Sequence, residues 1–381
     1  MMKKNIFIPT LIILLLSCGG TGVSDRKGNM DWKIFRGDPE LSGYTEIRLP
    51  EKPVLLWTFK SETRTVSSPI VNNGTTYWSD RRGRVLGVDI NGNQVFKFDM
   101  QTAVEATPMI YDTMLYIGRI DGFLYAISLS RQEMIWKYET MGQISASPNI
   151  VDFAGRKAIV FGTYDNYLYI VDANKGTLIN RFESGYYING AVALHNKNVI
   201  FGGCDGWLRI IDCETGISAD SLELENYIPA SPAIKGDFCY VGDHSGNIYE
   251  IQLKNGKVIH NQKIVTVKND TGTFTSVPVV CPKNLYYLFD RYIYSINRKD
   301  RKENWKYMLK GNVGESSPVV CHDKIIVCTK TGIVSILDAE KGDLLWEYDT
   351  GEQIVGSPAV IKDHFFILTA KGTLFCFGNK K

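Results

Sequence analysis

Net charge is nearly absent from this chain. Its 381 residues include 43 Lys and Arg against 41 Asp and Glu, which gives a formal net charge of +2. Lys3 and Lys4 precede an N-terminal apolar run, and without them the two signs balance at 41 each. A protein that binds nucleic acid needs a basic surface for the phosphates. The balance therefore argues against a nucleic-acid partner.

Sequence motifs of catalysis and metal binding are missing too. No GxSxG, HExxH, Walker or EF-hand pattern occurs. The five histidines do not form a metal-binding set: His195, His322 and His364 fall in equivalent turns of different repeats, and His244 and His260 stand alone. Equivalent turns are carried around a repeat protein and do not converge on one ion. The sequence thus predicts no catalytic residue, no metal site and no cofactor.

Cysteine pairs of the CxxC or Cys-Cys type do not occur either. Apart from Cys18, the number of cysteines is odd, and most of them lie inside apolar strand-like runs. This placement favours free, buried thiols that serve as small core residues. Cys281 and Cys321 occupy equivalent positions of neighbouring repeats, and a disulfide between them is the alternative, although such positions are usually too far apart. The seven are Cys204, Cys213, Cys239, Cys281, Cys321, Cys328 and Cys376.

What the chain does contain is a repeat of about 40 residues. In the unit 315–350, four short β-branched and aromatic runs are separated by turn residues, and nothing has helical spacing. A Ser-Pro pair or its equivalent marks eight copies, with steps of 39, 40, 43, 41, 46, 40 and 40 residues. In five copies a hairpin glycine follows the proline by 14 residues. The markers are Pro69, Pro108, Pro148, Ala191, Pro232, Pro278, Pro318 and Pro358. Four strands in a unit of this length predict a propeller blade, since solenoid repeats of that length are helical.

The two ends of the repeat region complement each other. The eighth copy, 356–378, has three strands and stops before the tryptophan strand. The orphan run at 54–60, Val-Leu-Leu-Trp-Thr-Phe-Lys, precedes Pro69 at the usual interval and matches 344–348 closely. It should complete the eighth blade and remove two open sheet edges. The predicted fold is therefore all-β: an eight-bladed propeller of four-stranded antiparallel blades, closed by an N-terminal strand.

The N-terminal residues have the features of a lipoprotein signal. A short basic stretch precedes an apolar run of about ten residues, too short to span a bilayer. Leu15-Leu16-Ser17-Cys18 resembles the bacterial lipobox, in which the cysteine is lipidated; an ordinary signal peptide with a chance cysteine is the alternative. We expect a signal peptide at 1–17, a lipidated tether at 18–30 and one propeller domain at 31–381.

The turns of the repeat carry a family resemblance. Leu337-Asp338-Ala339-x-x-Gly342-x-x-x-Trp346 resembles the pyrroloquinoline-quinone-type propeller repeat, and 171–176 repeats its first half. One branch of this group is the quinone-dependent dehydrogenases, whose vicinal cysteine pair and long insertions are absent here. The other is similar to the B subunit of the outer-membrane β-barrel assembly machinery. That resemblance implies a non-catalytic binding or scaffold lipoprotein; a dehydrogenase-like oxidoreductase and a glycan-binding surface lipoprotein stay open as alternatives.

Location and binding site follow from the same reasoning. Gly19 is not a retention aspartate and no acidic cluster follows Cys18. This pattern predicts a monomer anchored in the outer membrane that faces the periplasm, with surface exposure as the alternative. Its partners would be envelope proteins, the β-barrel assembly core among them. Loops before each Ser-Pro should ring the channel mouth, vary between copies and bind the partner. The candidate residues are Arg64, Glu105, Gln143, Tyr186, Tyr187, Asn189, Tyr227, Phe274, Glu315 and Gln353.

Overall fold

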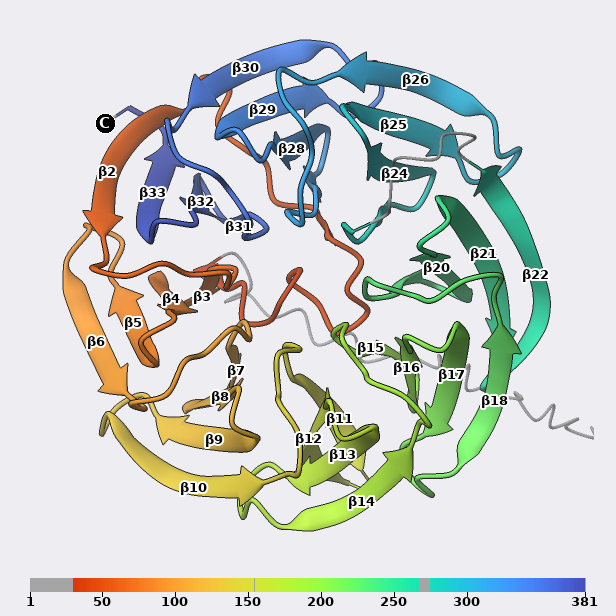
Figure 1. Cartoon of the computed structure of the whole chain (residues 1–381). Helices are drawn as coiled ribbons and strands as arrows, with labels where there is room; N and C mark the ends of the chain where they lie inside the picture. The colour runs from red at the N-terminus through yellow and green to blue at the C-terminus, as the bar shows by residue number, and fades with distance from the viewer. Residues whose placement is uncertain (1–29, 154, 267–274, 381) are drawn as a thin grey trace, which may run out of the picture.

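The computed structural model describes residues 30–153, 155–266 and 275–380. Within these ranges the regular structure consists of 33 strands and contains no α-helix. The strands form eight sheets arranged around a central axis, so the predicted all-β propeller is confirmed (Figure 1). The described part of the chain contains no helix long and apolar enough to cross a membrane.

Each blade is a four-stranded antiparallel meander whose first strand lies nearest the axis and whose fourth strand lies at the rim (Figure 1). Blades 1 to 4 are β3–β6 (Ile70–Asn72, Thr75–Ser79, Arg84–Val88, Gln94–Asp99), β7–β10 (Met109–Tyr111, Met114–Gly118, Phe123–Ser128, Glu133–Glu139), β11–β14 (Asn149–Phe153, Arg156–Gly162, Tyr167–Asp172, Leu178–Glu183) and β15–β18 (Ala193–His195, Asn198–Gly202, Trp207–Asp212, Ser218–Glu223). Blades 5 to 7 are β19–β22 (Ala233–Lys235, Phe238–Gly242, Asn247–Lys254, Lys257–Thr266), β23–β26 (Val279–Val280, Asn284–Phe289, Tyr292–Asn297, Glu303–Met308) and β27–β30 (Val319–Cys321, Lys324–Cys328, Ile333–Asp338, Leu344–Asp349). Blade 8 is β31–β33 (Ala359–Ile361, His364–Leu368, Thr373–Gly378) with β2 (Val54–Lys60), and the short β1 (Tyr44–Thr45) adds to blade 7.

Ring closure occurs as the sequence predicts. Strand β2 pairs antiparallel with β33, from Val54 opposite Gly378 to Lys60 opposite Thr373. The indole nitrogen of Trp57 donates a hydrogen bond to the carbonyl of Ile90 in blade 1, at 2.9 Å. Blade 8 is thus joined to blade 1 by covalent connection and by packing.

The same tryptophan contact joins other neighbouring blades. Trp136 donates to the carbonyl of Ala173 at 3.1 Å, and Trp305 donates to that of Ala339 at 3.2 Å. The turn glycine of the receiving blade lies flat against the indole: a Cβ at Gly176 would stand 2.5 Å from the Trp136 ring. This glycine also has a positive φ of 68°. The Asp-Ala-x-x-Gly turn therefore needs glycine both for its backbone and for the tryptophan of the preceding blade.

The fourth strand of each blade exposes a row of backbone groups at the rim. Its pairing with the third strand is irregular in every blade. In all eight blades the pairing of the third with the fourth strand contains a register shift, such as that between Gly87 and Val88. Bulges twist an edge and make it a poorer template for another strand. They are therefore consistent with eight exposed edges on one ring.

Residues 32–45, which we name the N-terminal strap, were not predicted to have a structural role. The strap crosses the middle of the ring (Figure 1) and bonds to the first strands of successive blades. Its carbonyls accept hydrogen bonds of 2.8–3.0 Å from the backbone N–H groups of Val71, Ile110, Leu194, Ile234, Val280 and Val320. The Trp32 N–H donates in return to the Val71 carbonyl at 2.7 Å. In blade 3 the side chain of Asn149 donates to Pro39 at 3.0 Å. The strap thus connects blades 1 to 7 in order.

One buried cation holds the strap in place. Arg36 is 1% exposed, and its guanidinium donates to four carbonyls, two of them from the Ser-Pro prolines of blades 6 and 7. Burial lowers the pKa of Arg36 to about 9. The backbone carbonyls of Pro278 and Pro318 accept hydrogen bonds from this buried guanidinium, whose charge is costly to bury. Loss of the Arg36 side chain would leave both carbonyls without these partners.

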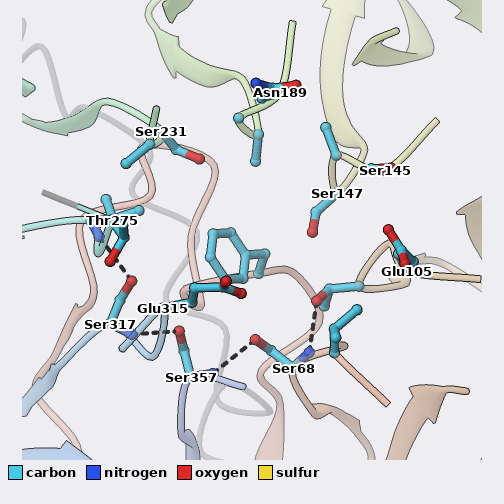
Figure 2. Close-up of a pocket in the computed structure, with 18 of the residues that line it drawn as sticks. Ser68, Glu105, Ser145, Ser147, Asn189, Ser231, Thr275, Glu315, Ser317 and Ser357 are labelled. Atoms are coloured by element: carbon cyan, nitrogen blue, oxygen red, sulfur yellow. Dashed lines mark hydrogen bonds between the residues drawn. The ribbon is translucent and has the colours of Figure 1, made fainter. Parts of the chain in front are cut away.

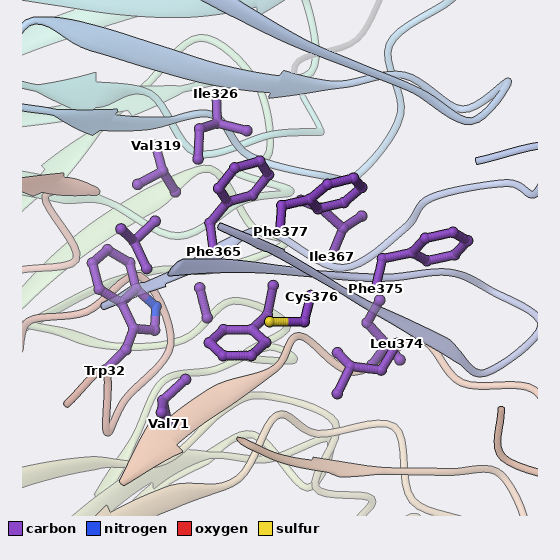
Figure 3. Packing of buried hydrophobic residues seen from close by; sticks show 14 of the residues in the cluster. Trp32, Val71, Val319, Ile326, Phe365, Ile367, Leu374, Phe375, Cys376 and Phe377 are labelled. Carbon is purple, nitrogen blue, oxygen red and sulfur yellow. The ribbon is translucent and has the colours of Figure 1, made fainter. Parts of the chain in front are cut away.

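The buried cores lie within and between blades. The cluster around the closing blade combines Trp32 of the strap, Val71 of β3 and the phenylalanines of β32 and β33 (Figure 3). Phe365 and Phe377 stack at 4.9 Å, and Trp346 packs edge-on against both. All seven cysteines of the described part are free thiols, six of them buried.

Candidate functional site

The repeat places one side chain from every blade around an axial cavity. The residue three positions before each proline faces the cavity. In the fourth repeat the proline position is held by Val192 and not by Ala191, the predicted marker, so the prediction was one residue off. The cavity has a volume of about 180 Å³. This upper ring consists of Val66, Glu105, Ser145, Asn189, Pro229, Thr275, Glu315 and Val355.

A second ring lies directly below the first. It is formed by the residue just before each proline, and six of its eight members carry a hydroxyl: Ser68, Thr107, Ser147, Ala191, Ser231, Val277, Ser317 and Ser357. Figure 2 shows several of these hydroxyls arranged around the cavity. The Ser-Pro repeat is therefore a ring of hydroxyls when seen along the axis.

Four of the six hydroxyls in this ring also accept a hydrogen bond from a neighbouring blade. The backbone N–H of one blade donates to the hydroxyl oxygen of the next: Val277 to Ser317 at 2.9 Å, Ser317 to Ser357 at 3.0 Å, and Ser357 to Ser68 at 2.9 Å (Figure 2). A fourth bond, 2.8 Å long, runs from Ser68 to Thr107. The serine before each proline is thus partly structural, because it satisfies a buried N–H of its neighbour.

The strap forms the lower boundary of the cavity. In six blades its backbone hydrogen bonds reach the residue two positions beyond the proline position, which lies deeper in the ring than the hydroxyls. Phe35 of the strap lines the cavity. The axial site is consequently a cup that opens toward the mouth.

A second cavity of about 330 Å³ adjoins the first over blades 6 to 8. The two share Thr275, Glu315 and Val355. Asp290 and Lys330 contribute charges of opposite sign to the second cavity. Glu315 therefore stands where the axial cup meets a lateral extension.

The predicted mouth residues separate into an inner and an outer group. Glu105, Asn189 and Glu315 belong to the upper ring. The other predicted mouth residues that the structure describes lie farther from the axis, most of them five positions before the proline. Their backbone carbonyls accept hydrogen bonds from N–H groups of the hairpin between the second and third strands. Examples are Arg81 to Arg64 at 3.0 Å, Tyr164 to Gln143 at 3.0 Å, Cys204 to Tyr187 at 3.3 Å, His244 to Tyr227 at 2.9 Å and Ala370 to Gln353 at 2.7 Å. These bonds place the loops and hairpins on one face; Phe274 and Cys18 lie outside the described residues.

Exposed aromatic side chains gather on the mouth at blades 3 to 5. Tyr186 and Tyr187 are 47% and 44% exposed. Tyr187 stacks on Tyr164 at 5.3 Å and touches Tyr186 at 5.0 Å. In the next blade Tyr227 stacks on His244 at 4.1 Å. Tyr164 and His244 were not among the predicted mouth residues, because both lie in hairpins between the second and third strands and not in the loops before the Ser-Pro pairs.

The charges of the site are few. Glu105 forms an ion pair with Arg81 at 2.9 Å. Glu315 has no ion pair or hydrogen bond with any residue of the described ranges, and its carboxylate lies toward the middle of the cavity (Figure 2). Burial raises the pKa of the Cys204 thiol, so this half-buried cysteine is protonated at neutral pH and a poor nucleophile. Within the described residues no group of three or more His, Cys, Asp or Glu side chains is arranged to hold a metal ion.

Fold and site together define an eight-bladed propeller of quinone-type repeats with an open axial cup that is lined by hydroxyls and rimmed by tyrosines. A family model described as outer membrane protein assembly factor BamB matches residues 54–262 and 290–380, and the chain belongs to this family.

Two curated relatives are similar over most of the chain. The tetrathionate hydrolase of Acidithiobacillus ferrooxidans is 24% identical over 280 residues, which cover 70% of this chain and 50% of that protein. The outer membrane protein assembly factor BamB of Shewanella oneidensis is 22% identical over 280 residues, covering 68% of this chain and 67% of the relative. The matches thus span between half and two thirds of these relatives.

Solved structures share the fold. BamB from Moraxella catarrhalis superposes with a TM-score of 0.70 at 17% identity, covering 86% of this chain and 98% of that one. A quinohemoprotein alcohol dehydrogenase from Comamonas testosteroni gives a TM-score of 0.74 at 14% identity, covering 92% and 81%. At these identities the likeness concerns the architecture only.

Proposed function

We propose that this chain is a non-catalytic, lipid-anchored binding protein of the bacterial envelope that takes part in outer-membrane protein assembly. Cys18 would carry the anchor, and the propeller would face the periplasm. The observation that carries the proposal is the mouth: a rigid ring of loops exposes tyrosines on one face, and the family to which the chain belongs is described by that assembly role.

The partner-binding surface is the aromatic part of the mouth. Tyr186 and Tyr187 lie side by side and nearly half exposed, and Tyr227 lies in the equivalent loop of the next blade. Tyrosine gives a large contact area at low conformational cost and is enriched at the centres of interfaces. Because Tyr187 is braced by Tyr164, it is ordered before a partner arrives, which reduces the entropy lost on binding.

Oxidoreductase activity is the weaker candidate. The quinone-dependent enzymes of this fold resemble each other in a vicinal cysteine pair above the cofactor, and the sequence has none. The thiol nearest the mouth, Cys204, contacts Asn189 and not a second cysteine. The hydrolase among the relatives aligns with 70% of this chain, so enzymatic activity has to be tested directly.

The test is affinity capture of the full tagged protein from detergent-solubilised envelopes, with the Tyr187→Ala/Tyr227→Ala double variant as control. We expect the wild-type chain to recover proteins of the β-barrel assembly core and the variant to recover much less. Equal recovery by both would place the partner site elsewhere, and failure to recover any assembly protein would contradict the proposed role.

A further inference from the structure

We propose that the axial cup is a saccharide-binding site that receives a single pyranose unit, whose neighbouring unit would extend into the lateral cavity. This activity goes beyond protein docking and uses different residues. It rests on three features of the cup: the donors and acceptors that remain free, the aromatic residue of the strap, and the charge of its wall.

Several hydroxyls of the ring donate no hydrogen bond within the described part of the chain. Ser68, Ser317 and Ser357 accept a backbone N–H through the oxygen, and no bond in which they donate is formed with the described residues. Ser147 and Ser231 form no hydrogen bond with the described part of the chain, and the Ser147 hydroxyl is directed inward (Figure 2). Each hydroxyl can donate one proton, so the lower ring offers several O–H donors to one small ligand.

The upper ring supplies acceptors. The Glu315 carboxylate is free of described partners and lies toward the middle of the cup (Figure 2). The side-chain oxygen of Asn189 is buried and has no hydrogen-bond partner among the described residues. A ligand that fits both rings must therefore donate and accept at several points, as the hydroxyls around a pyranose do.

Charge separates a sugar from other polar ligands. Among the described residues, two carboxylates and no Lys, Arg or His line the cup, and Glu105 is already paired with Arg81. An anion such as phosphate would meet the unpaired Glu315 carboxylate. An ammonium ion would pair with the Glu315 carboxylate, but it offers no acceptor to the serine O–H groups. Those O–H groups would then lack hydrogen-bond partners wherever water is excluded, which costs free energy of binding. A neutral polyol satisfies both sets.

Size and shape agree with this ligand. A volume of about 180 Å³ corresponds to roughly six waters at their share of the liquid, comparable to one sugar ring. Phe35 gives the cup an aromatic surface for the C–H face of a sugar. The lateral cavity opens at Glu315, so an oligosaccharide has a path out of the cup.

The experiment is saturation-transfer difference NMR on the full mature protein in detergent. The probes are the methyl pyranosides of mannose, glucose, galactose and N-acetylglucosamine at millimolar concentration. We expect transfer to ring C–H protons of at least one glycoside. Glu315→Gln should raise the Kd of that glycoside about tenfold, because the charged acceptor becomes a neutral amide. Phe35→Leu should reduce transfer while keeping an apolar side chain, and Glu340→Gln, on the exposed turn after β29 (Ile333–Asp338), should have no effect.

Thermal melts show whether each variant is folded, and only folded variants are compared. No transfer to any of the four glycosides would overturn the proposal. So would transfer that Glu315→Gln and Phe35→Leu leave unchanged, because the sugar would then lie outside the cup. Binding of the peptide acetyl-Gly-Lys-Gly-amide in place of the glycosides would assign the cup to a cation. None of these results depends on capture of an assembly partner, so the two proposals fail separately.

Discussion

Replacing Trp57 with alanine tests whether the N-terminal strand truly closes the ring in solution. Trp57 is half-buried, its indole packs beside Phe366 at 6.2 Å, and its N–H donates to Ile90 of blade 1. Truncating a fully buried aromatic residue to alanine costs about 3–5 kcal/mol, so about 2–3 kcal/mol is expected for a half-buried one. The lost hydrogen bond adds about 1 kcal/mol.

The expected loss is therefore about 3–4 kcal/mol, a large part of the ~5–15 kcal/mol that stabilises a typical domain. Trp136→Ala is the matched control. Trp136 makes the equivalent bond to Ala173 between blades that are continuous in the chain, and it is only 9% exposed. It should cost as much or slightly more.

Urea unfolding followed by tryptophan fluorescence and circular dichroism measures both variants. The midpoint should fall while the slope m stays that of the wild type, because the same surface is exposed on unfolding. If Trp57→Ala costs less than about 1 kcal/mol while Trp136→Ala costs several, strand β2 does not share the stability of the ring. The closure argument would then be wrong.

Three further outcomes are expected. The Tyr187→Ala/Tyr227→Ala variant should bind its captured partner more than about tenfold less tightly, with a nearly unchanged melting temperature, whereas Leu345→Ala on the outer strand should change neither. Stability should fall as the pH rises above about 8.5, because burial raises the pKa of Cys213, Cys328 and Cys376 to about 12 and these thiols ionise first in the unfolded chain, at about 1.4 kcal/mol per pH unit for each. Arg36, whose pKa burial lowers to about 9, offsets one of the three above that pH; a flat profile to pH 11 would contradict the burial of the thiols. Protein supplied with pyrroloquinoline quinone and calcium should show no alcohol- or sugar-dependent dye reduction in a spectrophotometric assay, and turnover would reverse our ranking of the two functions.

The sequence carries the parts of this fold that repeat. A proline marker recurs because each blade enters its first strand in the same way, and the orphan strand at 54–60 reveals closure because it lacks a blade of its own. The same marker locates Glu105 and Glu315 on the axis, three positions upstream in their copies, whereas Asn189 fits this spacing only from Val192 and not from the predicted marker Ala191.

Features that occur once escaped prediction. The strap binds mainly through backbone carbonyls, which any sequence possesses, and its one specific anchor, Arg36, gives no periodic signal. Tyr164 was missed because the residue type at its hairpin position differs from blade to blade, with Arg81, Cys204, His244 and Ala370 as its equivalents. Phe35 lines the axial cup from a segment that precedes the first repeat, so no comparison between repeats could have found it.

The joint between the two ends has a consequence for the order of events during synthesis. Strand β2 ends at Lys60, yet its partner β33 ends at Gly378. A ribosome adding ~5–20 residues per second leaves β2 without its partner for about 15–60 s. Throughout that interval Leu55, Trp57 and Phe59 are not part of a sheet. The strap lacks its hydrogen-bond partner in blade 7 until that blade is synthesised. Strand β2 is therefore synthesised early but pairs last. A factor that covers its apolar side chains during that interval acts on the step that closes the ring.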